Sequence, residues 1–414
     1  MDWSRDGTQW SVVDLFSGAG GMSFGFHAHR KFHIACGVDA EIGKPSSPRG
    51  SLGCNQTYHA NIGVQPLGID LAAIAPNDLA SAVQAATGLT SPTVLISCAP
   101  CTGFSRALAS NHLADDPRNS LVAKTALFAE ALRPQILLME NARELLRGNH
   151  GHHFATLEQS LRRQGFDVCG QVHFLDAFGL PQRRERALVI AVRSGLKLRT
   201  LGDLWKGYRI RDAATFVRQA ISHLPTIAAG EIHPADPHHA APQMTDLTLR
   251  RLRAIPHDGG SWLDLREHPQ ADELLTPAMK RSLARGKLGS HSDVYGRLAW
   301  DKPAVTIKRE CGHTGNGRYA HPDQDRLCSV RELAVLQGFP GSYRFPCSSL
   351  SNCYRHIGDA VPPLISHQLA LVCEWILTGR RPQLRRRLLP DTHLRPDDIE
   401  SVAAGKQRMQ PSSV

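Results

Sequence analysis

Apolar and polar residues alternate along the first 195 residues in a way that predicts both strands and helices. Six short apolar runs have the length and pattern of β-strands: Ser11–Phe16, His33–Val38, Thr93–Cys98, Gln135–Glu140, Val168–Leu175 and Arg186–Val192. Between several of them, Asn119–Leu132 and Phe154–Arg163 repeat apolar residues at helical spacing. Such alternation is typical of a parallel sheet covered by helices on both faces. We therefore predict a doubly wound α/β domain over residues 1–195, with a surface loop at residues 41–57.

The pattern changes after this domain. Residues 196–325 contain many Pro, His and Gly residues and few clear periods, which indicates a second, smaller and irregular domain. Helical spacing returns at Ser329–Gln337, whose Ser N-cap and third-position Glu form a capping box, and at Pro362–Thr378, which begins with prolines. We expect residues 326–390 to complete the first domain and residues 391–414 to be a poorly ordered tail.

Composition indicates a globular protein rather than a membrane or secreted one. Of the 414 residues, 42% are hydrophobic and 21% charged, and no apolar run reaches the ~18 residues that span a bilayer. The N-terminus carries no signal or transit pattern, so we expect a cytoplasmic location. The net charge of +10 suits a polyanionic partner, although it also fits a basic protein without one. No segment forms a basic tail, so a nucleic-acid groove has to be assembled by folding.

Neither the cysteines nor the histidines form a ligand pattern in the sequence. The ten cysteines are irregularly spaced, which argues against a disulfide scaffold and fits a reducing compartment. Their only close pair is Cys98 and Cys101, without the second pair that a zinc site needs. His150, His152 and His153 lie in a Gly- and Asn-containing stretch that is more typical of a solvated loop than of a metal site. We therefore predict no bound metal.

A glycine-rich motif follows the first predicted strand and opens a helix; it reads Asp14-Leu-Phe-Ser-Gly18-Ala-Gly20-Gly21. Glycines there let the backbone approach a ligand and present amide groups at a helix N-terminus. Asp39 ends the next strand, where an acidic residue can bind a ribose hydroxyl, and Asp70 is placed to bind an adenine edge. The motif indicates an adenosine-containing cofactor, with NAD, FAD and S-adenosylmethionine as competing identities and a turn without a ligand as the alternative. Its departure from G-x-G-x-x-G disfavours a pyrophosphate.

A second motif, Ala99-Pro-Cys101-Thr102-Gly-Phe-Ser105, comes straight after the strand Thr93–Cys98. A cysteine just past the carboxyl end of a parallel strand lies where α/β domains place reactive groups. Cys101 is therefore a candidate nucleophile. The alternatives are a buried inert cysteine or a redox pair with Cys98, and the second is weakened because Cys98 belongs to the strand.

Two further groups of polar residues adjoin predicted strands. Glu140, followed by Asn141 and Ala142, ends the strand that begins at Gln135, and a carboxyl held protonated by apolar surroundings can donate a proton. Arg184 and Arg186, two positions apart, point to one side of an extended segment, where they can stabilise a negative charge or orient a carboxylate. Each group by itself also fits a surface ion pair.

The order of these motifs resembles that of the cytosine-5 DNA methyltransferase family of bacterial restriction-modification type. The matching segments are DLFSGAGG, APCTGFS, MENA, QRRER, RELAVLQGFP and IGDAVPP, which cover the chain except for its middle domain. The resemblance implies a Rossmann-like, S-adenosylmethionine-dependent large domain and a smaller target-recognition domain, which Gly338-Phe339-Pro340 helps to organise. It also implies that the C-terminal helix folds back onto the large domain.

The resemblance assigns roles to individual residues. It implies that Cys101 is the nucleophile, that Glu140 acts at cytosine N3, and that Arg184 and Arg186 are the family's paired arginines. The resemblance implies that Phe16, Ser17, Gly18, Gly20, Gly21, Asp359, Ala360 and Val361 bind the cofactor. Asp39 and Asp70, the two acidic residues named above, complete the predicted cofactor site. Thiolate addition to C6 makes C5 nucleophilic, and the target cytosine has to leave the duplex. Thr102, Ala142 and Asp359 depart from the family pattern.

The resulting hypothesis is a monomeric enzyme that methylates C5 of cytosine in a short double-stranded DNA sequence and protects that DNA from a cognate restriction endonuclease. Two alternatives stay open, a tRNA cytosine-5 methyltransferase with the same motifs and a catalytically inactive DNA-binding relative. The middle domain favours DNA, and the presence of all four catalytic residues argues against lost catalysis. Ile255–Trp262 and Lys308–Tyr319 are candidate DNA-contact loops, although scaffold turns fit them equally well.

Overall fold

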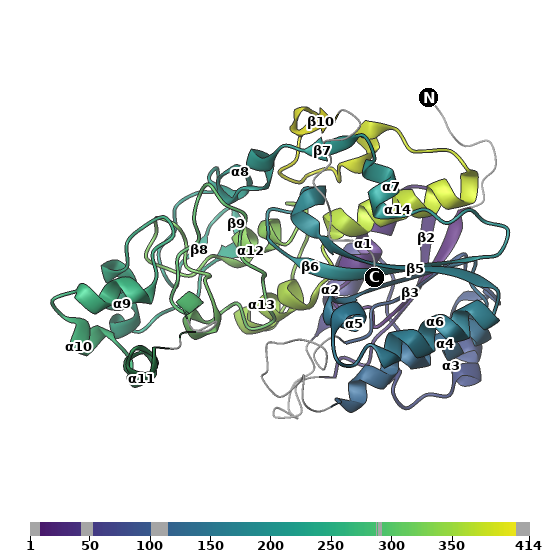
Figure 1. The fold of residues 1–414 in the computed structure, drawn as a ribbon, viewed down its shortest axis with the longest axis horizontal. Coiled ribbons are helices and arrows are strands. Elements are labelled where there is room, and N and C mark those ends of the chain that lie inside the picture. Colours follow the sequence, from purple (N-terminus) through teal and green to yellow (C-terminus); the bar gives the residue numbers. More distant parts are fainter. Residues whose placement is uncertain (1–8, 43–52, 101–114, 287, 289–291, 403–414) are drawn as a thin grey trace.

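A six-stranded sheet forms the centre of the larger part of the molecule (Figure 1). The computed structural model describes residues 9–42, 53–100, 115–286, 288 and 292–402. The sheet has the strand order β2-β1-β3-β4-β6-β5. Its strands are β1 Trp10–Leu15, β2 Phe32–Val38, β3 Val94–Ser97, β4 Ile136–Ala142, β5 Phe166–Phe174 and β6 Glu185–Arg193. Each of them coincides with a predicted strand, so the predicted α/β class is confirmed.

The prediction of a purely parallel sheet is wrong in one strand. β1 pairs in parallel with β2 and β3, and β3 pairs in parallel with β4. β6, in contrast, runs antiparallel to both of its neighbours, β4 and β5. The connection between β5 and β6 contains only the 3₁₀ turn Leu175–Phe178. It is too short for the crossover of a dozen or more residues that parallel neighbours need, so the two strands form a hairpin.

Helices cover both faces of the sheet, because apolar side chains along each strand point alternately to one face and the other. Val12 and Ile96 belong to the core under α1 and α14, whereas Val13 and Leu95 belong to the core under the helices of the opposite face. The first face carries α1 Gly21–His27 and α14 Pro363–Thr378; the second carries α3 Pro76–Thr87, α4 Ser120–Leu132, α5 Glu144–Arg147 and α6 His152–Arg163 (Figure 1). A further helix, α2 Cys54–Ile62, begins inside the predicted surface loop 41–57.

The C-terminal helix packs against the first helix, as expected for a chain that returns to its first domain. A β-carbon added at Gly25 of α1 would lie 2.1 Å from the backbone nitrogen of His367 and 2.1 Å from Oγ of Ser366. Gly25 N donates to Ser366 Oγ at 3.0 Å, and Ser366 Oγ donates to the carbonyl of Gly21 at 3.1 Å. Only glycine at position 25 permits this approach. α14 thus holds α1, and with it the end of the glycine-rich motif, in place.

One described stretch, Leu350–Thr378, has the length and apolar composition of a membrane span, but 89% of its most apolar window is buried inside the protein. This stretch comprises α13 Leu350–Asp359 and α14, with the break Ala360–Pro362 between them. Because α14 packs between the sheet and its neighbouring helices, its apolar surface is that of a core helix.

A second hydrophobic core runs from Val217 to Ala360 and divides the chain differently from the predicted boundaries. It takes side chains from α8 Val217–Ile221, α9 Asp246–Ala254, α10 Ala271–Leu274, α11 Pro277–Arg285, α12 Val330–Leu336 and α13. The two-stranded sheet of β8 Ile232–His233 and β9 Asp236–Ala240 adjoins α12, where Arg331 Nε donates to Asp236 Oδ2. The predicted capping box at the start of α12 is present. Ser329 Oγ accepts from Glu332 N, and the Glu332 carboxylate accepts from Ser329 N and from Arg326.

Segments on either side of this second core pack with the first one. α7 Leu201–Trp205 and β7 Tyr208–Ile210 lie with α14, where Trp205 Nε1 donates to Gln368 Oε1 at 2.8 Å. Part of the expected C-terminal tail is also ordered. Leu394 is buried in the first core, and β10 Ile399–Ser401 pairs antiparallel with β7. The sequence pattern missed this segment because a three-residue strand carries no period of its own.

Candidate active site

The glycine-rich motif forms a tight loop between β1 and α1. Phe16, Gly18 and Gly20 have φ values of 58°, 50° and 92°, in the left-handed region that glycine adopts without strain. Asp39, directly after β2, reaches across to this loop, and its Oδ2 accepts from Gly18 N at 2.9 Å. Oδ1 of Asp39 accepts from Glu41 N at 2.7 Å. Burial raises the pKa of the Asp39 carboxyl, although these two backbone hydrogen bonds oppose the shift.

Two polar side chains beneath the loop lack some hydrogen bonds. Oδ2 of Asp14 accepts from Ser23 Oγ at 2.6 Å, and Ser23 Oγ in turn lies 2.7 Å from the Tyr58 hydroxyl. Oδ1 of Asp14 and Oγ of Ser17 are buried without a hydrogen-bond partner in the described part of the chain. Burial raises the pKa of the Asp14 carboxyl to about 7, with the Ser23 hydrogen bond opposing and the Asp39 charge adding to the shift. Asp14 and Ser23 were not among the predicted site residues.

The remaining predicted cofactor residues come from two other segments, one beside the end of β2 and one in contact with the loop. Asp70 is exposed and caps its own turn, with Oδ1 accepting from Ala72 N; the segment before it lies beside β2, where Asp39 N donates to the carbonyl of Leu67. The backbone of Val361 contacts the loop so closely that a β-carbon on Gly21 would lie 2.3 Å from its carbonyl oxygen.

Asp359, at the end of α13, lies on the side of the loop that faces the second core. Its Oδ2 lies 3.2 Å from Nε of Arg309. Desolvation by surrounding protein raises the pKa of the Asp359 carboxyl to about 6, against the opposing charge of Arg309. The Asp359 side chain is 43% exposed, so water also screens its carboxyl.

Glu140 and Arg186 meet across adjacent antiparallel strands. Glu140 is the fifth residue of β4 and Arg186 the second of β6, and the register pairs Arg186 with Ala142. Nε of Arg186 lies 2.9 Å from Oε1 of Glu140, and the Glu140 side chain is only 8% exposed. The predicted acid and one predicted arginine therefore form a buried ion pair.

The second predicted arginine binds elsewhere. Arg184 is buried, and its Nη1 donates to the carbonyl of Ile307 at 3.1 Å. Ile307 belongs to the second core. The two arginines, expected on one side of an extended segment, thus divide their contacts between Glu140 and the second part of the molecule.

Cys101 and Thr102 lie outside the described residues, but the chain that leads up to Cys101 is described. Ala99 follows β3 and is buried, and its carbonyl accepts from Asn141 Nδ2 at 3.0 Å. Asn141 directly follows Glu140 in β4. The chain therefore leaves toward Cys101 from a point fixed by the neighbour of Glu140. Asn141 had been noted only as part of the motif, and its buried amide is the signal for this role.

A chain of buried amides joins the two cores next to this site. Gln182 Oε1 accepts from Ile307 N at 2.9 Å, and Gln182 Nε2 donates to Gln337 Oε1 at 2.6 Å. Gln337 Nε2 donates to the carbonyl of Ala360 at 2.8 Å. Buried side-chain amides with satisfied partners fix the relative position of the segments they connect. Gln182, the first residue of the QRRER segment, is therefore a positioning residue that the sequence did not reveal.

The two candidate DNA-contact loops are partly scaffold. Trp262 and Tyr319, the last residues of the two segments, are fully buried in the second core. Arg318 does not extend into solvent as a free cation, because its Nη1 donates to the carbonyls of Gly259, Gly260 and Arg297. The scaffold interpretation thus holds for these residues.

Comparisons with known proteins match the chain over most of its length. The sequence profile described as C-5 cytosine-specific DNA methylase matches residues 10–375. The type II methylase M.HgiDII of Herpetosiphon aurantiacus is 31% identical over 92% of this chain and 99% of its own. The type II methyltransferase M1.HphI of Haemophilus parahaemolyticus is 29% identical over 87% of this chain and 85% of its own.

Solved structures share the fold at low sequence identity. A candidate DNA modification methyltransferase from an E. coli prophage superposes with a TM-score of 0.61 at 17% identity, covering 89% of this chain and 99% of its own. The S. pombe Dnmt2 methyltransferase superposes with a TM-score of 0.53 at 16% identity, covering 88% of this chain and 99% of its own. The predicted Rossmann-like methyltransferase fold is thereby confirmed.

Proposed function

Because the chain belongs to the C-5 cytosine-specific DNA methylase family, we propose that it methylates one cytosine within a specific short sequence of double-stranded DNA. The protein is a DNA (cytosine-5-)-methyltransferase, and S-adenosylmethionine is its methyl donor. The observation that carries the proposal is the buried Glu140–Arg186 pair, which lies beside the point where the chain continues toward Cys101. The pair adjoins Asn141, which binds the carbonyl of Ala99, two residues before Cys101 in the sequence.

The glycine-rich loop and its surroundings fit S-adenosylmethionine. The buried Ser17 hydroxyl needs a partner, and a bound cofactor would supply one. A β-carbon added at Gly18 would meet nothing within 4 Å, so the space beside this glycine is open to a cofactor. Asp39, Asp70 and Asp359 would hold the hydroxyl, amine and cationic groups of the cofactor, together with the backbone of Ala360 and Val361. The bound cofactor supplies an activated methyl group on its sulfonium.

The residues of the chain would activate the cytosine in the following way. The Cys101 thiolate forms a bond to C6, and the displaced electron pair makes C5 nucleophilic. Glu140, once it has taken up a proton, shares or donates that proton at N3, which neutralises charge as it develops on the ring. Arg186 orients Glu140 through their 2.9 Å contact. After C5 has gained the methyl group, its proton passes to solvent and the C5–H electron pair re-forms the C5–C6 double bond. The C6–sulfur bond then breaks, and its electron pair returns to the thiolate.

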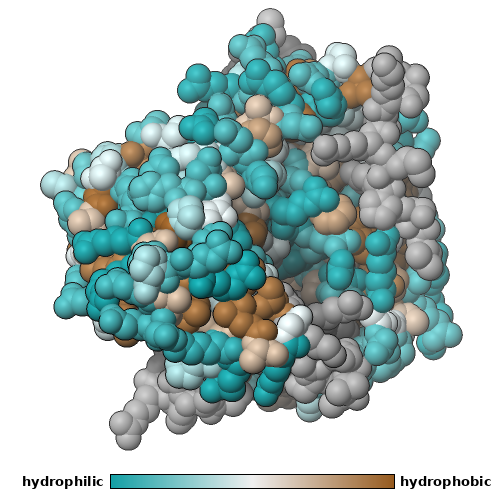
Figure 2. Space-filling view, turned by 60° about the vertical axis from the view of Figure 1, so that its left-hand side comes forward, coloured by the Kyte–Doolittle hydropathy of each residue, from teal (hydrophilic) through white to brown (hydrophobic). Residues whose placement is uncertain are grey.

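Access to C5 requires that the cytosine leave the duplex. Figure 2 shows a hollow between the two parts of the molecule, with hydrophilic side chains on both sides of it. The net charge of +10 favours a polyanion there. We infer that DNA lies in this hollow, that the second part of the molecule reads its sequence, and that a monomer modifies each strand in turn.

The relatives support a proposal for the biological role. M.HgiDII and M1.HphI are type II methylases, and the chain matches nearly the whole length of the first. We infer that this enzyme acts in the cytoplasm and protects host DNA from a cognate restriction endonuclease.

A methyl-transfer assay tests the proposal. Wild type, Cys101→Ser and Glu140→Gln are incubated with tritiated S-adenosylmethionine and either mixed-sequence duplex DNA or a tRNA pool. We expect label in DNA from wild type, none from Cys101→Ser, and a 5-methylcytosine in one sequence context on sequencing of the product. Label in tRNA alone would move the activity to RNA. Bound cofactor with label in neither substrate would contradict catalysis.

A further inference from the structure

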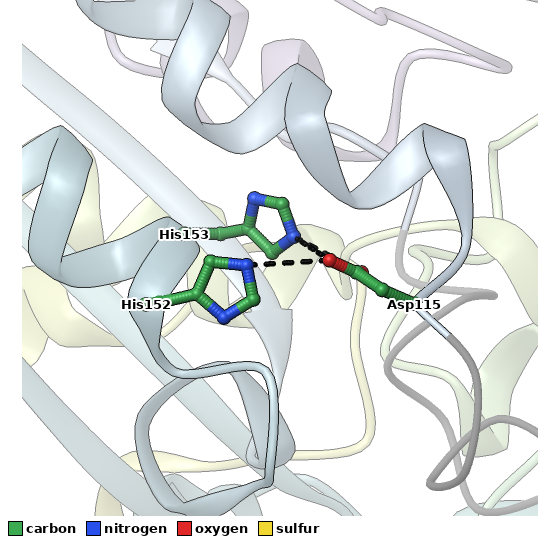
Figure 3. Close-up of side chains that lie close together, drawn as sticks. All are labelled: Asp115, His152 and His153. Atoms are coloured by element: carbon green, nitrogen blue, oxygen red, sulfur yellow. Dashed lines mark hydrogen bonds and ion pairs between the residues drawn. The ribbon is translucent and has the colours of Figure 1, made fainter.

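A cluster of metal-ligating side chains lies at the start of α6, apart from the residues assigned above. His152 and His153 are the first residues of α6, and Asp115 comes from the segment that precedes α4. Nε2 of His153 lies 2.8 Å from Oδ2 of Asp115, and Nε2 of His152 lies 3.2 Å from the same oxygen (Figure 3). The three donor atoms all lie within 4.8 Å of one another. We propose that Asp115, His152 and His153 bind a divalent transition-metal ion, with Zn²⁺ as the ion that fits best.

A hydrogen bond from the side chain of Asn119 orients the Asp115 carboxylate. Oδ1 of Asp115 accepts from Asn119 Nδ2 at 2.8 Å, and Asn119 is fully buried. Metal ligands in proteins are commonly fixed by such outer hydrogen bonds.

The histidines are partly fixed as well. The His153 side chain is only 11% exposed, and its ring packs against that of His152 with centroids 4.1 Å apart. Nδ1 of His150, whose side chain is 13% exposed, lies 3.8 Å from Oδ1 of Asp115. His150 is thus close enough to become a fourth ligand after a small movement. The sequence favoured a solvated loop here because Asp115 and Asn119 are remote from the histidines along the chain.

The chemistry and spacing of the donors select Zn²⁺. Imidazole nitrogen and carboxylate oxygen both bind Zn²⁺ at about 2.0–2.2 Å, so two tetrahedral ligands lie roughly 3.3 Å apart. The oxygen–nitrogen distances of 2.8 and 3.2 Å need to open only slightly to admit the ion. Mg²⁺ and Ca²⁺, which prefer oxygen ligands, suit this set poorly. The bound ion would join Asp115 to α6 and so stabilise the folded state.

Zinc binding to matched variants tests the proposal. Tag-free wild type, the double variant His152→Gln/His153→Gln, and Asp115→Asn are stripped with a chelator and titrated with Zn²⁺ against a chromophoric competitor. His33→Gln, which removes an exposed histidine at the start of β2, is the control. We expect wild type and the control to bind one Zn²⁺ more than the double variant. Asp115→Asn should bind this ion at least about 10-fold more weakly.

Two further measurements separate this site from the cysteines and from misfolding. Zn²⁺ should raise the Tm of wild type and of His33→Gln, but not that of the double variant, whose metal-free Tm reports its folding. Co²⁺ in the same site should give visible absorption bands without the near-ultraviolet band of thiolate ligands. Equal Zn²⁺ stoichiometry and an equal Tm shift in wild type and the folded double variant would overturn the proposal. So would a thiolate band that both proteins share in equal strength.

Discussion

Asp14 should make the stability of this protein fall as the pH rises through neutrality. The side chain lies beneath the glycine-rich loop, is 1% exposed, and has its pKa raised by burial to about 7. In an unfolded chain the pKa of an aspartate is about 3.9. A difference of about 3 pH units corresponds to about 4 kcal/mol of folding free energy. Because the folded pKa is the higher one, this stability is present below about pH 4 and is lost as the pH rises through about 7.

Asp14→Asn removes this titration and keeps the size of the side chain. Between about pH 5.5 and 8.5, the free energy of unfolding of the wild type should fall by roughly 2 kcal/mol more than that of the variant. Urea unfolding followed by tryptophan fluorescence at both pH values measures this difference. Asp167→Asn, which replaces an exposed carboxyl on β5, is the matched control and should keep the wild-type slope. An equal loss in wild type and Asp14→Asn would refute the raised pKa.

Three other substitutions test the site and the packing. Glu140→Gln should lower kcat for DNA methylation by about 10²–10⁴-fold while cofactor affinity, measured by calorimetry, stays the same; unchanged kcat would remove Glu140 from the mechanism. Gly25→Ala should destabilise the protein by about 3 kcal/mol or more, because the new methyl group meets the backbone of α14 at 2.1 Å. Gly68→Ala, where a β-carbon meets nothing within 4 Å, is its control, and similar Tm values for the two would contradict the close contact. Leu394→Ala should lower the free energy of unfolding by about 2–5 kcal/mol, since this side chain is buried in the first core. A change below about 0.5 kcal/mol, as is usual for surface substitutions, would show that the segment does not pack there.

The second core shows which structural features a local sequence pattern predicts and which it does not. The capping box predicted at Ser329 is present in α12, because its hydrogen bonds join residues three positions apart. The domain boundaries near residues 195 and 326 do not follow the packing, since α7 joins the first core and α12 the second. Both helices bury their apolar side chains, and nothing in a single helix states which partner these side chains will meet.

The sequence by itself determined the strands, the glycine-rich loop and the residue types of the catalytic motifs. These features depend on alternation, on φ preferences and on chemical identity, all of which are local properties. The tertiary structure alone decided that β6 runs antiparallel, which places Arg186 against Glu140 while Arg184 binds Ile307. It also decided that Asp115 meets His153, 38 positions away in the sequence. Such pairs form because long-range packing of the whole chain brings their elements together, and the spacing of residues along the chain does not encode that distance.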